Sequence, residues 1–326
     1  MKHSSMMFQL FLYTSLFSCA QPSPQQEARE EKIKAFYIGH SLSDGIAEML
    51  WGLTQKEEKT HFEYGYQRIN GTPLRNQWNQ LLKDTHPEYL DYTDSFMLKT
   101  FDSTIVDEAA HLYRFFNKEN GLASGKYTHL VMTESIPRYY GEGWGNIEDT
   151  YRYTDSFYNY AKKFNPDIKP YLYEVWHCIN SGTPQGCDHE KNNHLFRERL
   201  DVDLPMWESV VDKFNSKNPR QKMKLIPVGQ ALAQLYDAIE KKQVPGIQSM
   251  RNLFTDAIHV NDTLRYFNAC VHYAVFFERS PVGLTNELFH LNGDPFIRLN
   301  KAMADKLQRI AWQAVKKYQS KKNRIS

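Results

Sequence analysis

The stretch AFYIGHSLSDGI, Ala35–Ile46, decides the fold class of this chain. An apolar, strand-like run ends abruptly in Gly-His-Ser, and polar residues then lead into a helical pattern. A strand followed directly by a helix is the repeating unit of α/β proteins. The serine on this turn has two interpretations. Ser41 is either a nucleophile displayed between strand and helix, or the N-cap of the helix that follows.

The same alternation of strand-like and helical segments continues along the chain. With 33–39, the strand-like runs are residues 61–69, 128–135, 169–176 and 223–229. The helical patterns cover 44–55, 73–83, 105–119, 147–164 and 230–242. Strands separated by helices pair in parallel through right-handed crossovers, and helices then cover both faces of the sheet. The sequence therefore predicts a single three-layer α/β/α sandwich domain, with about five parallel strands, over residues 33–319.

A last helix is expected near the C-terminus. Leu299, Met303, Leu307 and Ile310 follow one another at spacings of four, four and three, which makes one apolar stripe. We expect this stripe to dock on the sheet. The basic residues 320–326 are expected to form a short solvated tail.

Composition excludes few classes of function. The 326 residues carry 40 basic and 38 acidic side chains, a formal charge of +2, which gives no reason to expect a nucleic-acid partner. Aromatic residues make up 14% of the chain. Such a content suits a sugar-binding cleft, but most of these rings are expected in an ordinary core.

The N-terminus predicts export. A basic start and a short apolar run over residues 1–18 describe a secretory signal peptide, too short to span a membrane. Cys19 follows LFS, which resembles the bacterial lipobox and implies that Cys19 is lipidated. The Pro- and Gln-rich residues 19–32 are then a tether, and the protein is anchored in the bacterial cell envelope by lipid alone. The alternative is a plain cleaved signal with an incidental cysteine.

Export makes a disulfide possible. Cys178 and Cys187 flank the turn-rich loop INSGTPQG and can bridge in an oxidising compartment. Cys270 lies in an apolar helical stretch and is expected to be a buried free thiol.

Polar and glycine residues gather where the predicted strands end. Ser41, Gly71, Glu134, Trp176 and Gly229 lie at or just after such ends. Active sites of open α/β sheets lie at the carboxyl ends of the strands. This convergence favours a nucleophile over a helix cap at Ser41.

A serine nucleophile needs a base, and the base needs an orienting carboxylate. The best candidate pair is in FTDAIHVND, where Asp256 and His259 are three residues apart. On a tight turn this spacing brings the carboxylate to the ring Nδ1–H and leaves Nε2 facing outward. Asp256, His259 and Ser41 are therefore the predicted catalytic residues, with Asp-x-x-His alone a weak signal.

At this point the chain resembles the SGNH, or GDSL-like, hydrolases, which have a flavodoxin-like α/β/α fold. IGHSLS is similar to their first block, with Ser41 as nucleophile and His40 in place of the usual Asp. RINGTPL resembles the second, whose glycine amide, here Gly71, serves the oxyanion hole with that of Ser41. DAIHVND resembles the last block, with Asp256 and His259 in its Asp-x-x-His positions.

The third block departs from the family pattern. The family usually has Gly-x-Asn-Asp there, whose Asn donates to the oxyanion, but this chain has LVMTESIPRYY. The resemblance is closer to a divergent branch with a Gln- or Glu-containing strand end. Glu134 is then either a neutral carboxyl that donates to the oxyanion, or an ionised one that points away, and we expect the second arrangement.

Five side chains are candidates for contact with substrate. Tyr140 and Trp144 lie in the Gly-rich loop RYYGEGWGN, which packs poorly by itself and suits a cleft. Trp176 and His177 follow a predicted strand, where core and cleft are equally open. His40 is included because it precedes the nucleophile.

The resemblance implies an esterase that needs neither a metal nor an organic cofactor. The expected substrate is an acyl ester, foremost an acetyl ester on a carbohydrate. The alternatives are a lipase or thioesterase, and a surface glycan-binding protein that keeps the fold but has lost the chemistry.

Overall fold

Five parallel strands form one sheet in the order β2-β1-β3-β4-β5. The computed structural model describes Met1 and residues 31–85, 114–135, 146–187 and 194–325. The strands are β1 (Glu31–Gly39), β2 (Thr60–Arg68), β3 (His129–Met132), β4 (Lys169–Tyr173) and β5 (Lys224–Ile226). The predicted flavodoxin-like sheet is thus confirmed. It begins at residue 31, so the last two residues of the expected tether belong to β1.

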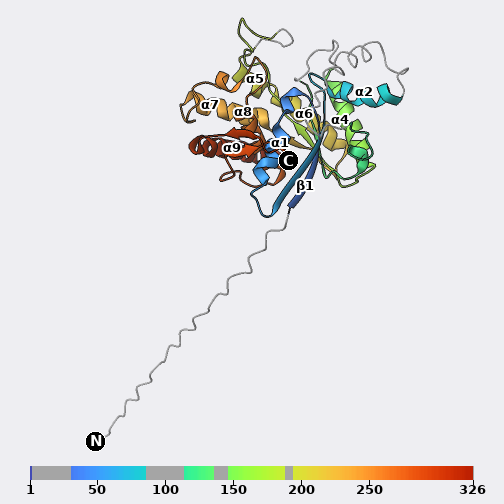
Figure 1. Cartoon of the computed structure of the whole chain (residues 1–326), viewed down its shortest axis with the longest axis horizontal. Coiled ribbons are helices and arrows are strands. Elements are labelled where there is room, and N and C mark those ends of the chain that lie inside the picture. The colour runs from blue at the N-terminus through green and yellow to red at the C-terminus, as the bar shows by residue number, and fades with distance from the viewer. Residues whose placement is uncertain (2–30, 86–113, 136–145, 188–193, 326) are drawn as a thin grey trace.

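Helices cover both faces of the sheet (Figure 1). On one face α1 (Ile46–Thr54), α7 (Val228–Glu240) and α8 (Asp262–Phe276) pack side by side. On the other, α2 (Leu74–Thr85), α4 (Ile147–Lys162) and α6 (Leu204–Lys217) do the same. The short α5 (Phe196–Val202) contacts α6 and α7. Among the described residues, short 3₁₀ turns lie at η1 (Ser41–Ser43), η3 (Leu122–Ser124) and η4 (Met250–Leu253).

The inner strands are shorter than their apolar runs. β3 ends at Met132 and β4 at Tyr173, and the residues that follow are buried without being in a strand. Gly229, expected after β5, lies inside α7. The helix expected over 105–119 is wrong at its end, because residues 114–120 form turns, while 105–113 lie outside the described residues. An apolar run in the sequence indicates buried residues, and the residues after β3 and β4 are buried outside the sheet. The apolar runs therefore overestimate the length of these strands.

The C-terminal helix is α9 (Lys301–Ile325), and it packs on α7 and α8. Leu307 and Ile310 are buried there, whereas Leu299 precedes the helix. The expectation that this stripe docks on the sheet is therefore wrong, because α7 and α8 already cover that face. Residues 320–325 continue the helix and do not form a separate tail.

A small antiparallel hairpin, β6 (Glu287–Phe289) and β7 (Pro295–Arg298), was not predicted from the sequence. It packs on α1, where Leu288 is buried against Gly52. Strands of three and four residues are too short to show an alternating pattern. Within the described ranges, no helix combines the length and apolarity that a membrane crossing requires.

Candidate active site

The turn after β1 is fixed by close backbone packing. Gly39 has no room for a side chain, because a Cβ there would lie 2.3 Å from Ser43 Oγ. Its carbonyl accepts hydrogen bonds from the Ile69 amide at 3.1 Å and from Gln77 Nε2. Ser43 Oγ donates to the His40 carbonyl at 2.7 Å. These contacts fix the turn between the end of β1 at Gly39 and the start of α1 at Ile46, at the carboxyl end of the sheet.

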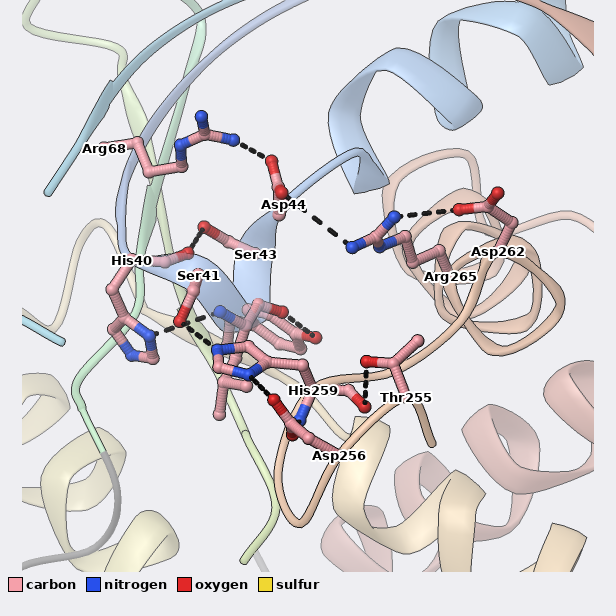
Figure 2. A network of polar contacts seen from close by, with 12 residues as sticks. His40, Ser41, Ser43, Asp44, Arg68, Thr255, Asp256, His259, Asp262 and Arg265 are labelled. Carbon is pink, nitrogen blue, oxygen red and sulfur yellow. Dashed lines mark hydrogen bonds and ion pairs between the residues drawn. The ribbon is translucent and has the colours of Figure 1, made fainter. Parts of the chain in front are cut away.

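Ser41 does not cap the following helix. α1 begins at Ile46, its N-cap is Gly45, and His40 caps the turn η1. The Ser41 hydroxyl instead meets His259 Nε2, with 2.9 Å between Oγ and the ring nitrogen (Figure 2). These two residues are 218 positions apart, so only the tertiary structure brings them together.

Asp256 and His259 face each other across a tight turn. His259 Nδ1 lies 2.7 Å from Asp256 Oδ2, and Figure 2 shows the three side chains in a line from Ser41 to Asp256. Asp256 Oδ1 accepts from the amides of Ile258 at 2.8 Å and His259 at 2.7 Å. With Nδ1–H donated to the carboxylate, Nε2 is left to accept the serine proton.

The environment keeps Asp256 ionised. Partial burial by itself raises the pKa of this carboxyl, but the hydrogen bonds from the His259 and Ile258 amides and from the His259 ring outweigh that effect. The pKa of Asp256 therefore lies below its usual value. A charged carboxylate beside Nδ1 stabilises the imidazolium that forms when His259 takes a proton.

Asp44 connects three of the segments around the site. Its carboxylate pairs with Arg68 at the end of β2, and lies 3.8 Å from Arg265 of α8 (Figure 2). Arg265 also pairs with Asp262 at 2.8 Å, three residues after His259. Ion pairs thus connect the nucleophile turn with the end of β2, which precedes Gly71, and with the segment that follows His259. This role of Asp44 is not visible in the sequence, because nothing local links Asp44 to either arginine.

The expected oxyanion donors are the backbone amides of Ser41, on the nucleophile turn, and of Gly71, which follows β2. Gly71 has φ of +66°, a backbone conformation that favours glycine. In the described part of the chain, neither the Ser41 amide nor the Gly71 amide donates to a protein acceptor. Both remain available to a ligand oxygen.

The Glu134 carboxylate bonds to the protein scaffold, which fits the expected arrangement of an ionised carboxyl that points away from the oxyanion. Its carboxylate accepts hydrogen bonds from the Ser135 amide at 2.8 Å, the Leu74 amide at 3.3 Å and Thr150 Oγ1 at 2.9 Å. A carboxyl that accepts from three donors is stabilised in its charged form. Glu134 instead fastens the end of β3 to α2 and α4.

Three of the predicted substrate contacts are wrong because the side chains are buried. His40 bonds through Nε2 to the Glu134 carbonyl at 3.0 Å. His177 pairs with Asp203, and Trp176 donates its indole N–H to the Ile258 carbonyl at 2.8 Å. Tyr140 and Trp144 lie outside the described residues, as do Cys19 and the predicted signal peptide beyond Met1.

The expected disulfide joins Cys178 and Cys187, and Cys270 is a buried free thiol. Burial raises the pKa of Cys270 far above its usual value, so this thiol stays protonated.

A cavity of about 710 Å³ lies on the other side of the nucleophile turn. Ser43, Asp44 and Gly45 form its wall next to the turn. Rings and charged side chains from β1, β2, α1, α8 and the hairpin complete the lining: Tyr37, Tyr64, Tyr66, Phe296, His290, Glu48, Arg68, Arg265 and Asp294. Asp44 pairs with Arg68 and lies 3.8 Å from Arg265, Glu48 Oε1 lies 3.2 Å from His290 Nδ1, and Asp294 Oδ2 accepts from Asn292 Nδ2 at 2.9 Å. Ala47, Leu291 and Asn292 also line the cavity, and neither Ser41 nor His259 is among the described residues of its lining.

Comparison with known proteins supports the fold. No protein-family model matches the chain, and no curated protein does. A DUF4886 family protein from Bacteroides uniformis is 18% identical, with a TM-score of 0.53 over 87% of this chain and 95% of its own. A protein named for its likeness to GDSL lipases, from Parabacteroides merdae, is 10% identical, with a TM-score of 0.43 over 77% of this chain and 99% of its own. A two-domain esterase active on acetylated mannans is 10% identical, with a TM-score of 0.41 over 82% of this chain and 53% of its own.

Proposed function

We propose that this protein is a serine esterase of the SGNH type. The observation that carries the proposal is the aligned arrangement of Ser41, His259 and Asp256, with 2.9 Å and 2.7 Å between successive side chains. These are the distances and the order that nucleophilic acyl transfer requires. The same alignment speaks against the alternative of a binding protein that has lost its chemistry.

The reaction follows from the geometry. Ser41 Oγ attacks the ester carbonyl carbon and its proton passes to His259 Nε2. His259 then returns that proton to the leaving alcohol, which leaves an acyl group on Ser41. Water attacks this acyl-enzyme by the same proton transfers and releases the acid. Asp256 holds the ring tautomer, and the amides of Ser41 and Gly71 stabilise the oxyanion.

We further propose an acetyl ester of a carbohydrate as the substrate. Ser41 and His259 do not line the cavity beside the turn, so the proposal about the substrate rests on the predicted export and not on that cavity. The predicted signal peptide and lipidated Cys19 would place the protein in the cell envelope, where such polymers are met. A lipase or thioesterase is the second possibility, and it would need an apolar groove.

Hydrolysis of p-nitrophenyl acetate, butyrate and octanoate by purified protein tests the reaction and the acyl group. We expect hydrolysis that falls steeply with chain length and is abolished in Ser41→Ala. Rising activity with chain length would favour the lipase. If none of the three esters is hydrolysed, the result favours the alternative of a glycan-binding protein that has lost its chemistry. Acetate release from acetylated xylan or mannan, with the deacetylated polymer as control, then tests the carbohydrate.

A further inference from the structure

The exposed turn that carries the base lies on a buried segment. The side chains of His259 and Asp256 are 40% and 56% exposed. Trp176, His177 and Cys178, which follow β4, are at most 1% exposed. Ile258 in this turn packs against the core, while the polar side chains add little packing of their own. The position of the turn therefore depends on Ile258 and on the groups to which the turn is hydrogen-bonded.

Two hydrogen bonds join the turn to this segment. Trp176 Nε1–H donates to the Ile258 carbonyl, and the Ile179 amide donates to the Ala257 carbonyl, both at 2.8 Å. Within the turn, the amides of Ile258 and His259 already donate to Asp256. The amides thus hold the carboxylate, and the two carbonyls bind the turn to the segment after β4. Arg251 Nη1 also donates to the Asp256 carbonyl, at 2.9 Å.

The buried segment is itself held in place. His177 pairs with the buried Asp203 through Nε2. Its Nδ1 accepts a hydrogen bond from Arg199 Nη2, with 3.1 Å between the two nitrogens. Cys178 is bonded to Cys187. The indole of Trp176 lies wholly inside the core. This side of the contact is therefore a fixed support for the turn.

We propose that Trp176 is a positioning residue, which sets His259 Nε2 against Ser41 Oγ by holding the Ile258 carbonyl. The inference rests on the proposed function only for its kinetic consequence. Ser41 follows β1, and Trp176 follows β4 of the same sheet. By binding the turn of His259, Trp176 therefore fixes the base relative to the sheet that carries the nucleophile. A displacement of about 1 Å in such a pair can cost ~10²-fold in rate.

The test compares Trp176→Phe with Trp207→Phe. Both remove an indole N–H from a buried side chain, but Trp207 lies on α6, away from the turn. With p-nitrophenyl acetate we expect Trp176→Phe to lower kcat about 10–100-fold, because the base is displaced. KM should stay within about twofold and Trp207→Phe should keep kcat within about threefold, as the turn is untouched. Equal losses in the two variants would overturn the proposal, and so would a raised KM at unchanged kcat.

A second measurement does not depend on activity. Hydrogen exchange of the peptide containing residues 255–259 should become at least about tenfold faster in Trp176→Phe and not in Trp207→Phe, because an anchor of the turn is lost. Unchanged exchange in Trp176→Phe would overturn the proposal even in a protein that hydrolyses no ester, a result that would separately overturn the esterase. If Trp176→Phe does not fold, benzothienylalanine at position 176 keeps the ring shape and removes only the N–H donor. The same two outcomes then decide the question.

Discussion

At the scale of single residues, the site depends on which partner each polar atom has. Ser41 Oγ is bonded to the histidine and not to a helix, and Asp256 uses one oxygen for two amides and the other for the ring. The Glu134 oxygens accept from the Ser135 amide and from Thr150 Oγ1, and neither of these donors belongs to the proposed triad. The two carboxylates therefore have different tasks, one in orienting the base and one in holding the scaffold.

Asp256→Asn should keep the fold and reduce kcat by ~10⁴, the loss that the same change causes in a serine protease. The amide would offer N–H to Nδ1 and favour the wrong ring tautomer. Steady-state kinetics with p-nitrophenyl acetate, together with a circular dichroism spectrum, measure this. Near-normal kinetics in the Asn variant would remove Asp256 from the triad.

Glu134→Ala should reduce stability more than catalysis. It leaves the buried amides of Leu74 and Ser135 without their acceptor, at about 1–3 kcal/mol for each unsatisfied group. Thermal unfolding should show a lower Tm, while kcat of the folded protein changes only a few-fold. A loss of ~10²–10³ in kcat at unchanged Tm is the signature of an oxyanion donor and would contradict the assignment.

At the scale of elements, the carboxyl end of β4 does more than bound the sheet. The segment that follows carries the anchor of the catalytic turn at Trp176, the buried pair of His177 and Asp203, and the disulfide of Cys178. A segment with this many constraints stays in place when the exposed turn moves. The disulfide therefore supports the site indirectly.

Loss of the disulfide should lower the free energy of unfolding. The bond closes a loop of nine residue steps, for which the chain-entropy model gives roughly 2–3 kcal/mol. The double variant Cys178→Ala and Cys187→Ala should lose about this much unfolding free energy in urea titration. Cys270→Ala is the matched control for a buried cysteine outside the bond. Mass spectrometry of a non-reduced digest of the wild type should show the 178–187 linkage, and free thiols at both positions would refute it.

At the scale of the whole molecule, stability should depend on pH through Glu174. This carboxyl lies buried after β4, and burial raises its pKa to about 8 against the opposing hydrogen bonds from Gln230. Its folded pKa is above its unfolded pKa, so the folded state binds the proton more tightly. The contribution to stability is full below about pH 4.5 and is lost as the pH rises through about 8.

Glu174→Gln should remove that dependence. The unfolding free energy of the wild type should fall relative to that of the variant between pH 5 and pH 8, as urea titrations at several pH values would reveal. A constant difference between the two proteins across this range would show that Glu174 titrates normally. Glu240→Gln, an exposed carboxyl on α7, is the control and should leave the pH dependence of the wild type unchanged.

The parallel sheet, the serine turn and the Asp-x-x-His pair could be predicted from the chain alone, because these features depend on local patterns. Strand–helix alternation and a three-residue spacing are visible within a short window of the chain. The resemblance to SGNH hydrolases then supplied the order of the blocks. It also assigned Gly71 to the oxyanion hole, and this stays a prediction.

The burial and the bonding partners of residues that contact distant parts of the chain became known from the tertiary structure alone. Trp176 and His177 follow a strand as cleft residues would, yet they are buried because α5, α6 and the catalytic turn close over them. Glu134 proved an acceptor because the start of α2 comes to it from 60 residues away. Burial and hydrogen-bond partners at such separations arise from packing of whole elements, which no local pattern of side chains encodes.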